Sequence, residues 1–223
     1  MTRHRKPQEW IDEILKAAST EIEENGYASL TMEAVARRVE LSKGGVYRFF
    51  SNKQDLSLAL FTSCYAESLE IDVDNAVSWD LSIVDTFNRV LLQFHDLDED
   101  KLTSRRVWLH IMPEVLRDER FRAERERLLI EIEARFADLA RRLLEREGFP
   151  VTPEMEERIS AAIKLGVALF EGFTIQRSLG SKIEQEALTR MFVESLVDSS
   201  LLRAEEGPGD REPARIAATE VPR

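Results

Sequence analysis

The sequence has few of the features that mark secreted or membrane proteins. A single cysteine, Cys64, among 223 residues excludes an intrachain disulfide and fits a reducing cytoplasm. No stretch reaches the roughly 18 uninterrupted apolar residues of a membrane helix. The basic start is followed by charged residues, where a signal peptide would have its apolar core. We therefore expect a cytoplasmic protein that makes no contact with a membrane.

Motifs for catalysis and for metal binding are also lacking. None of the three histidines, His4, His95 and His110, follows an acidic residue at a spacing of three, and no second cysteine is available as a ligand. The sequence contains no phosphate-binding glycine loop, nucleophile elbow or zinc-protease motif. We expect no metal, no cofactor and no enzymatic activity.

Glycine and proline are scarce, at nine and seven residues, and apolar residues recur at spacings of three and four. This period predicts an all-α fold. A first helix ends at Asn25-Gly26, and the side chains of Thr31 and Ser42 can cap two short helices that follow. Ser51 is expected to cap a fourth helix. The longer helices are expected at 52–76, 80–96, 101–112, 117–147, 154–179 and 183–202.

These helices, about nine in total, divide into two regions. Residues 1–7 form a basic arm, and residues 8–60 a three-helix domain of the helix-turn-helix type. Residues 61–202 form a larger helical bundle. Residues 203–223, with Gly-Pro-Gly and two further prolines, are expected to be a disordered tail.

The net charge of −11 argues against a nucleic-acid partner, but its distribution does not. Residues 1–60 hold nine basic and nine acidic residues, so the remainder of the chain carries the whole deficit. Positive charge is concentrated in residues 1–8 and 31–53. DNA affinity depends on local positive potential, because neutralised phosphates release counterions. The N-terminal region can therefore bind DNA although the whole chain is acidic.

Residues 31–50 place two short helices around a tight turn, and the second would enter the major groove. Gly44-Gly45 lies in its first turn, where each glycine costs roughly 1 kcal/mol relative to alanine. Neither solubility nor core packing requires two glycines there. A bare backbone would let the helix approach DNA closely, with its amides facing phosphate. Lys43 and Arg48 would be outward donors, and Tyr47 would place a hydroxyl over a phosphate.

The segment TMEAVARRVELSKGGVYRFFSNKQDL, residues 31–56, resembles the tetracycline-repressor (TetR) family of transcriptional regulators. The resemblance implies a dimer that binds palindromic operators and divergent C-terminal helices that bind an effector. By position it implies DNA contacts at Thr31, Ser42, Lys43, Gly44, Gly45, Tyr47 and Lys53, and the local charge adds Arg37 and Arg48. Glu40 stands where the family often has glycine, which implies a left-handed backbone at a cost of about 1 kcal/mol. Phe49 replaces a histidine or tyrosine that often touches phosphate.

The last two expected helices are apolar around much of their circumference, which favours burial by a second copy of the chain. Gly166 and Gly172 would allow another helix to pack closely. The resemblance further implies an internal cavity for a small apolar or aromatic effector. Its candidate wall residues, each also consistent with plain core packing, are Phe87, Leu91, Phe94, Trp108, Met112, Phe170 and Phe173.

The sequence thus predicts a dimeric repressor that a small molecule releases from its operator. One alternative is a helical ligand-binding or scaffold protein whose basic N-terminal helices bind a protein partner. Another is an all-helical enzyme without a known motif. The sequence names neither operator, effector nor regulated genes, and repression and activation remain open.

Overall fold

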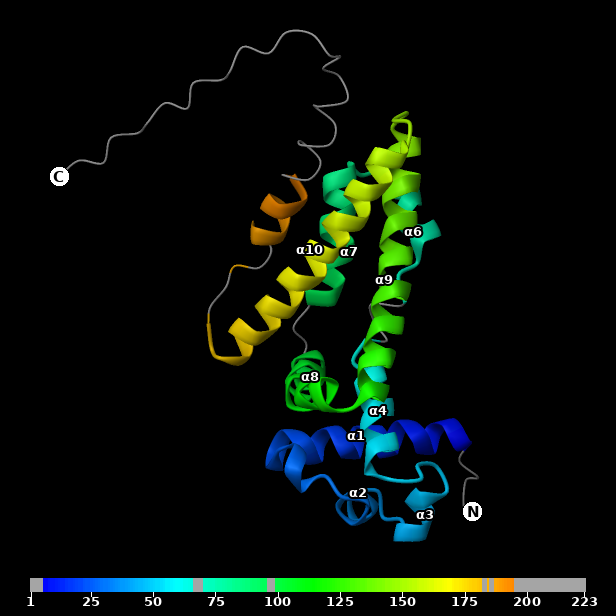
Figure 1. Cartoon of the computed structure of the whole chain (residues 1–223), viewed down its shortest axis with the longest axis vertical. Helices are drawn as coiled ribbons and strands as arrows, with labels where there is room; N and C mark the ends of the chain where they lie inside the picture. Colours follow the sequence, from blue (N-terminus) through cyan, green and yellow to red (C-terminus); the bar gives the residue numbers. More distant parts are fainter. Residues whose placement is uncertain (1–5, 66–69, 96–98, 182–183, 185–186, 195–223) are drawn as a thin grey trace, which may run out of the picture.

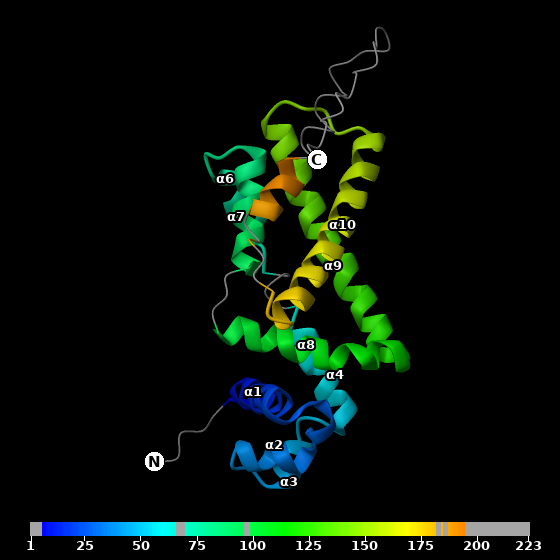
Figure 2. The same ribbon diagram turned by 90° about the vertical axis from the view of Figure 1, so that its left-hand side faces the viewer.

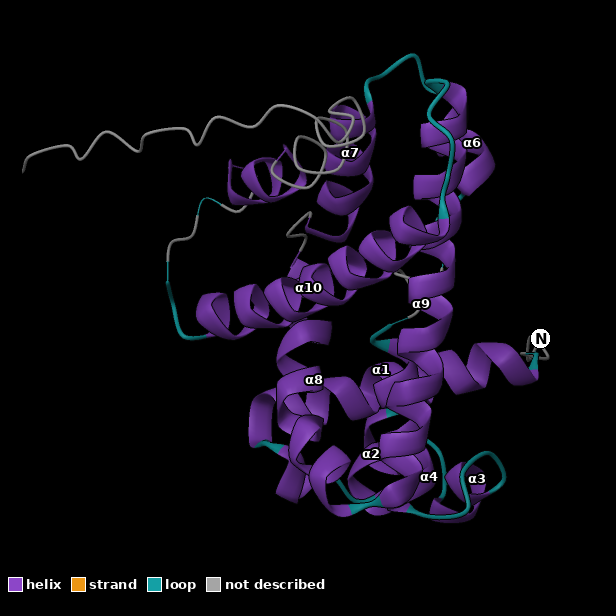
Figure 3. Ribbon diagram, turned by 45° about the horizontal axis from the view of Figure 1, so that its top comes forward, coloured by secondary structure: helices purple, strands orange, loops and turns teal. Residues whose placement is uncertain are grey.

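The computed structural model describes residues 6–65, 70–95, 99–181, 184 and 187–194. Within residues 92–105 it describes the backbone alone. These residues form helices and connecting loops without a strand, which confirms the all-α prediction (Figure 3). The tail at 203–223, the arm up to residue 5 and the ends of the last expected helix lie outside the described residues.

The N-terminal helices gather at one end of the molecule (Figure 1). They are α1 (Pro7–Asn25), the short 3-10 helix η1 (Tyr27–Ser29), α2 (Met32–Arg38), α3 (Lys43–Tyr47) and α4 (Lys53–Ser63). Along α1, Ile14, Ala18 and Ile22 are fully buried, as the apolar period predicts. The helix ends where Gly26 adopts a φ of 79° and its amide donates to the carbonyl of Ile22 at 2.7 Å.

The larger region is built on two long helices. The elements are α6 (Val73–Ser78), α7 (Ile83–His95), α8 (Glu99–Arg117), α9 (Glu119–Arg146), α10 (Pro153–Ser178) and a further helical segment at 187–194. Helices α9 and α10 run in opposite directions and cross obliquely within this region (Figures 1 and 2). Helix α8 crosses below them and lies directly over α1 (Figure 2).

The expected helix at 52–76 is wrong in its extent. Helix α4 ends at Ser63, and α6 is a separate helix beginning at Val73. The N-cap of α4 is Asn52 rather than Ser51, because the Asn52 side chain accepts a hydrogen bond from the Asp55 amide at 2.9 Å. Helix α8 runs past its expected end through Pro113 to Arg117. Apolar spacing alone could not mark these boundaries, since it continues across them.

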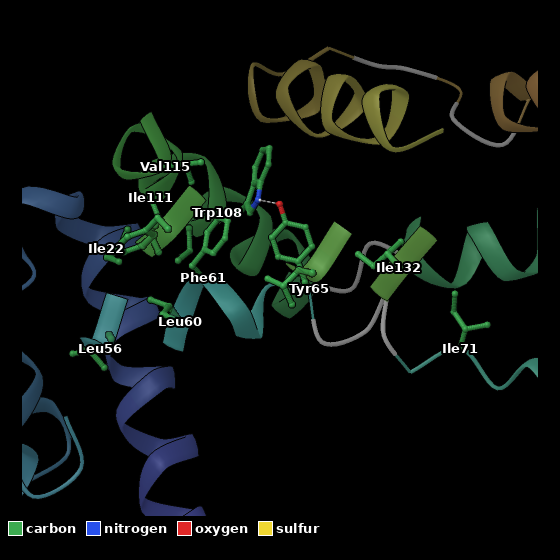
Figure 4. Close-up of a cluster of buried hydrophobic side chains, with 14 of the residues drawn as sticks. Ile22, Leu56, Leu60, Phe61, Tyr65, Ile71, Trp108, Ile111, Val115 and Ile132 are labelled. Carbon is green, nitrogen blue, oxygen red and sulfur yellow. Dashed lines mark hydrogen bonds between the residues drawn. The ribbon is translucent and has the colours of Figure 1, made fainter. Parts of the chain in front are cut away.

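A single apolar core joins the two regions. Ile22 of α1 and Leu60 and Phe61 of α4 pack with residues of α8 and α9 (Figure 4). The ring of Phe61 lies edge-on to Tyr65 at 5.3 Å and to Phe121 at 5.9 Å between centroids. The N-terminal helices are therefore packed directly on the larger bundle, and a shift in the bundle would move them.

Candidate nucleic-acid interface

The two short helices of the interface begin at the expected caps. The Thr31 hydroxyl accepts the Ala34 amide at 3.1 Å, and the Ser42 hydroxyl accepts the Gly45 amide at 3.1 Å. Both caps join residues three positions apart, so the local sequence is sufficient to set them. They fix where α2 and α3 start and hold Thr31 and Ser42 at the helix ends, where amides can meet an anion.

The turn between α2 and α3 has the expected strained backbone. Among the described residues Glu40 is the only non-glycine with a positive φ, at 55°. The next amide, that of Leu41, donates to the carbonyl of Ala36 at 2.9 Å, which closes the turn. The left-handed conformation expected at Glu40 is therefore confirmed.

The two glycines of α3 occupy different environments. A Cβ at Gly45 would lie 3.2 Å from the Cβ of Leu41, tighter than ordinary packing. Core packing thus gives a reason for Gly45 that the sequence did not reveal. A Cβ at Gly44 would meet only the Ser42 hydroxyl, at 3.9 Å. Packing within the chain accordingly leaves the glycine at position 44 unexplained.

The outward face of α3 carries exposed polar side chains. The side chain of Lys43 is 53% exposed and Tyr47 is 42% exposed, with the ammonium 5.7 Å from the Tyr47 ring centroid. Arg37 and Arg48 are also exposed. These four side chains are therefore accessible to a partner molecule.

Lys43 is paired within the protein. Its Nζ donates to the carboxylate of Glu33, from the first turn of α2. The pair raises the pKa of Lys43 and lowers that of Glu33, so both groups are charged at neutral pH. A phosphate that binds Lys43 must therefore compete with this carboxylate.

Lys53 lies differently from the other basic candidates. Its Nζ donates to the carbonyl of Tyr27 at 2.8 Å and sits 4.3 Å from the centroid of that ring. Partial burial lowers the pKa of Lys53. The Tyr27 hydroxyl in turn donates to Ser57 at 3.2 Å. Lys53 thus connects the start of α4 to η1 in the protein without DNA.

Arg38 and Phe49 also make internal contacts. Arg38 Nε donates to Glu21 at 2.7 Å, and a second guanidinium nitrogen donates to Glu24, which binds α2 to α1. Phe49 packs against the core. Arg38 is one of the positive charges in residues 31–53, but the two carboxylates of α1 neutralise it. The positive potential of the interface therefore comes from fewer residues than the sequence suggests.

The candidate effector residues lie in and around the core of the larger region. Trp108 is buried, and Phe87, Leu91, Met112 and Phe170 are partly buried against the same core. Phe173 is partly buried, and the side chain of Phe94 lies outside the described residues. Trp108 Nε1 donates to the hydroxyl of Tyr65 at 3.0 Å (Figure 4). Sequence reasoning missed Tyr65, which follows α4 and has no distinguishing local pattern.

A partly buried ion pair lies close to Tyr65. Arg125 of α9 donates to Glu171 of α10 at 2.7 Å, while its Nε is buried without a hydrogen-bond partner. Burial raises the pKa of Tyr65, and the hydrogen bond with Trp108 and the nearby Arg125 guanidinium lower it by less. Polar groups from α8, α9, α10 and the end of α4 thus meet here. Among the described residues no cluster of histidine, cysteine or acidic side chains could hold a metal.

Polar contacts bridge the two regions at their boundary. Arg120 of α9 pairs with Asp55 of α4 at 3.2 Å, and Thr62 of α4 donates to Glu124 at 2.9 Å. On the other side, Arg106 of α8 pairs with Glu23 of α1 at 3.6 Å. Two helices, α4 and α1, therefore connect α2 and α3 to the bundle.

The capped α2–α3 pair, its exposed polar face and the all-helical bundle define a helix-turn-helix protein of the DNA-binding class. Residues 14–60 match the model of the family described as bacterial regulatory proteins, tetR family, and this region of the chain belongs to that family. The resemblance of residues 31–56 is thereby confirmed.

A curated relative supports the same assignment over part of the chain. The uncharacterized HTH-type transcriptional regulator YhgD of Bacillus subtilis (strain 168) is 33% identical over 78 residues. The match covers 35% of this chain and 40% of that protein.

Solved structures share the whole fold. A putative TetR-family regulator from Mesorhizobium loti MAFF303099 has a TM-score of 0.66 at 20% identity, covering 89% of this chain and 98% of the other. A putative transcriptional regulator from Pseudomonas aeruginosa PAO1 has a TM-score of 0.69 at 16% identity, with 92% and 96% covered. GusR of Salmonella enterica has a TM-score of 0.64 at 17% identity, with 88% and 100% covered. The fold and the family match of residues 14–60 together support a DNA-binding transcription regulator.

Proposed function

We propose that the chain is a dimeric repressor that binds a palindromic operator through α3 and leaves it when a small molecule binds the helical bundle. The observation that carries the proposal is the Ser42-capped α3, whose exposed Lys43 and Tyr47 flank a glycine that internal packing does not require. The proposed DNA contacts are Thr31, Arg37, Ser42, Lys43, Gly44, Gly45, Tyr47, Arg48 and Lys53.

A mobility-shift assay with the DNA flanking the gene, with and without competitor DNA, tests the proposal. Lys43→Ala should weaken binding and make the slope of log K against log salt shallower by up to about 0.9. Tyr47→Phe removes only a hydroxyl, so affinity should fall while the fold survives. If both variants bind DNA like the wild type, α3 is not the recognition helix.

Lys53→Ala needs a stability measurement beside the binding assay. Because its ammonium is held by Tyr27, a loss of affinity could follow from a displaced α4 rather than a lost phosphate contact. Unchanged thermal stability with a shallower salt slope would support a phosphate contact. A lower melting temperature with an unchanged slope would make Lys53 a structural residue.

The proposed dimer rests on the outer face of α10. Leu165, Ile175 and Leu179 are 51%, 42% and 75% exposed. The helix is also long and apolar enough to cross a membrane, and only 6% of its most apolar 18-residue stretch is buried within the protein. A single helix of this kind is weak evidence for a membrane protein, and a second copy would cover the same side chains. Gly166 does not supply a contact for the partner, because a Cβ at this position would lie 3.5 Å from the ring of Phe192 in the same chain.

Sedimentation of charge variants tests the interface. Leu165→Arg should give monomers and abolish cooperative operator binding, because an unpaired charge would enter an apolar interface. Ile130→Arg, at a 61% exposed position of α9, is the matched control. If only the Ile130 variant dissociates, the interface lies on α9. Partition into detergent or lipid by the wild type would instead favour a membrane role for α10.

The proposed effector site lies between α8 and α10, around Trp108, Met112 and Phe170. A ligand can lower DNA affinity only by binding the form that is not on the operator more tightly. A shift of α8 or α4 would change the separation of the two recognition helices from the ~34–36 Å of successive major grooves. Apolar and aromatic compounds that quench tryptophan fluorescence should release operator DNA. Binding without release across a broad screen would favour a constitutive regulator.

A further inference from the structure

An acidic residue lies within the proposed DNA-binding surface. Glu33 is the second residue of α2, and its carboxylate accepts from the ammonium of Lys43, the first residue of α3. Both side chains are 53% exposed, so the pair is accessible to a duplex docked on α3. The cation nearest to the glycine at position 44 is therefore neutralised by a neighbouring helix.

The fold does not depend on this pair. Exposed ion pairs contribute little to stability, because water screens them and both side chains lose freedom. Met32, Val35 and Val46 already bury the contact between α2 and α3, and Thr31 and Ser42 cap the two helices. An acid in the first turn of α2 is favoured by the helix dipole, but that role does not require the pair with Lys43.

We propose that Glu33 competes with DNA phosphate for Lys43 and so limits the affinity of the surface for DNA. The inference rests on the proposed function, in which Lys43 binds phosphate. When phosphate takes over the ammonium, the Glu33 carboxylate stays beside the duplex without its counter-charge. It then retains a cation from solution, which offsets one of the counterions that the duplex releases.

Other basic residues near α3 make the competition consequential. Arg38 is engaged by Glu21 and Glu24, and Lys53 by the Tyr27 carbonyl. With those two groups paired within the protein, Lys43 shares the remaining exposed positive charge around α3 with Arg37 and Arg48. Its pairing with Glu33 therefore has a measurable effect on a surface that belongs to a chain of net charge −11.

The test measures anisotropy of a labelled 30-base-pair duplex of arbitrary sequence at several salt concentrations. Glu33→Gln should tighten binding about two- to fivefold, the range that the loss of an exposed ion pair allows. The slope of log K against log salt should steepen by up to about 0.9. Asp74→Asn is the matched control, since it removes one charge from an exposed ion pair in the first turn of α6. It should leave both quantities close to the wild-type values.

The double variant Glu33→Gln/Lys43→Gln decides the mechanism. If Glu33 acts through Lys43, Glu33→Gln should tighten binding less once Lys43 is replaced, because only the repulsion between the carboxylate and the duplex is then relieved. Equal tightening in both backgrounds, or none in the wild type, would overturn the proposal. A Lys43→Gln variant that binds DNA like the wild type would show that α3 does not form the DNA-binding surface. Circular dichroism and thermal unfolding confirm that each variant is folded.

Discussion

Replacing Gly44 by alanine separates the demands of folding from those of DNA binding. The glycine is the second residue of α3, and an added Cβ would meet only the Ser42 hydroxyl at 3.9 Å. Alanine in a helix is favoured over glycine by about 0.5–1 kcal/mol, since it restricts the unfolded chain more. The free energy of unfolding should be up to about 1 kcal/mol higher for this variant than for the wild type. For a chain of this size, that raises Tm by about 2–4 °C.

The same methyl group should weaken DNA binding. If the backbone at Gly44 lies against a phosphate, the methyl group separates an amide from its acceptor. A hydrogen bond to a charged group contributes about 1.5–3 kcal/mol, which corresponds to a loss of roughly tenfold or more in affinity. Anisotropy with the flanking DNA at fixed salt measures this loss, and thermal unfolding of the same preparation measures stability.

Gly45→Ala is the comparison. Its Cβ would lie 3.2 Å from that of Leu41, so part or all of the gain in helix propensity is offset by displaced packing. It should therefore be less stable than Gly44→Ala. A Gly44→Ala protein that is more stable and binds DNA like the wild type would refute the close-approach argument. A less stable one would show that the space at position 44 is not free.

Three further changes test other parts of the structure. Glu40→Gly should raise the free energy of unfolding in urea by up to about 1 kcal/mol by relieving the left-handed backbone, and a loss would mean that the side chain stabilises the turn. Tyr65→Phe leaves the buried Trp108 Nε1 without its acceptor and should lower thermal stability by about 1–3 kcal/mol, whereas an unchanged Tm would contradict a buried hydrogen bond. Arg38 holds the pKa of Glu21 below its ordinary 4.5, so this carboxylate stabilises the fold above that pH and loses its effect as the pH falls through the lowered pKa. Glu21→Gln should therefore be less stable than wild type at pH 7, with the difference shrinking below about pH 4.5 in urea titrations; a constant difference would contradict the ion pair.

The local sequence predicted the elements whose causes are local. Thr31 and Ser42 cap helices through amides three residues away, and Glu40 is strained because of its own backbone. Apolar spacing likewise identified the buried face of α1. Such features depend on neighbours within one helical turn, so the order of residues is enough to determine them.

Helix boundaries and glycine roles were harder to predict. The apolar period continues past Ser63, so the end of α4 could not be read from it. Gly45 is constrained by Leu41, and Gly166 faces Phe192, which is distant in sequence. Because glycine has no side chain, the sequence does not indicate which atoms lie beside it. Only the packed structure shows which atoms occupy that space.

The sequence by itself determined the helical class, the capped α2–α3 pair and the basic character of its surface, because each follows from short-range spacing and composition. Only the tertiary structure decided which charges are free. Lys43, Lys53 and Arg38 look alike in the sequence, yet one pairs with Glu33, one with the Tyr27 carbonyl and one with α1. Their partners are 10, 26 and 17 residues away and come close only when the helices pack, so the electrostatics of the interface is a property of the fold.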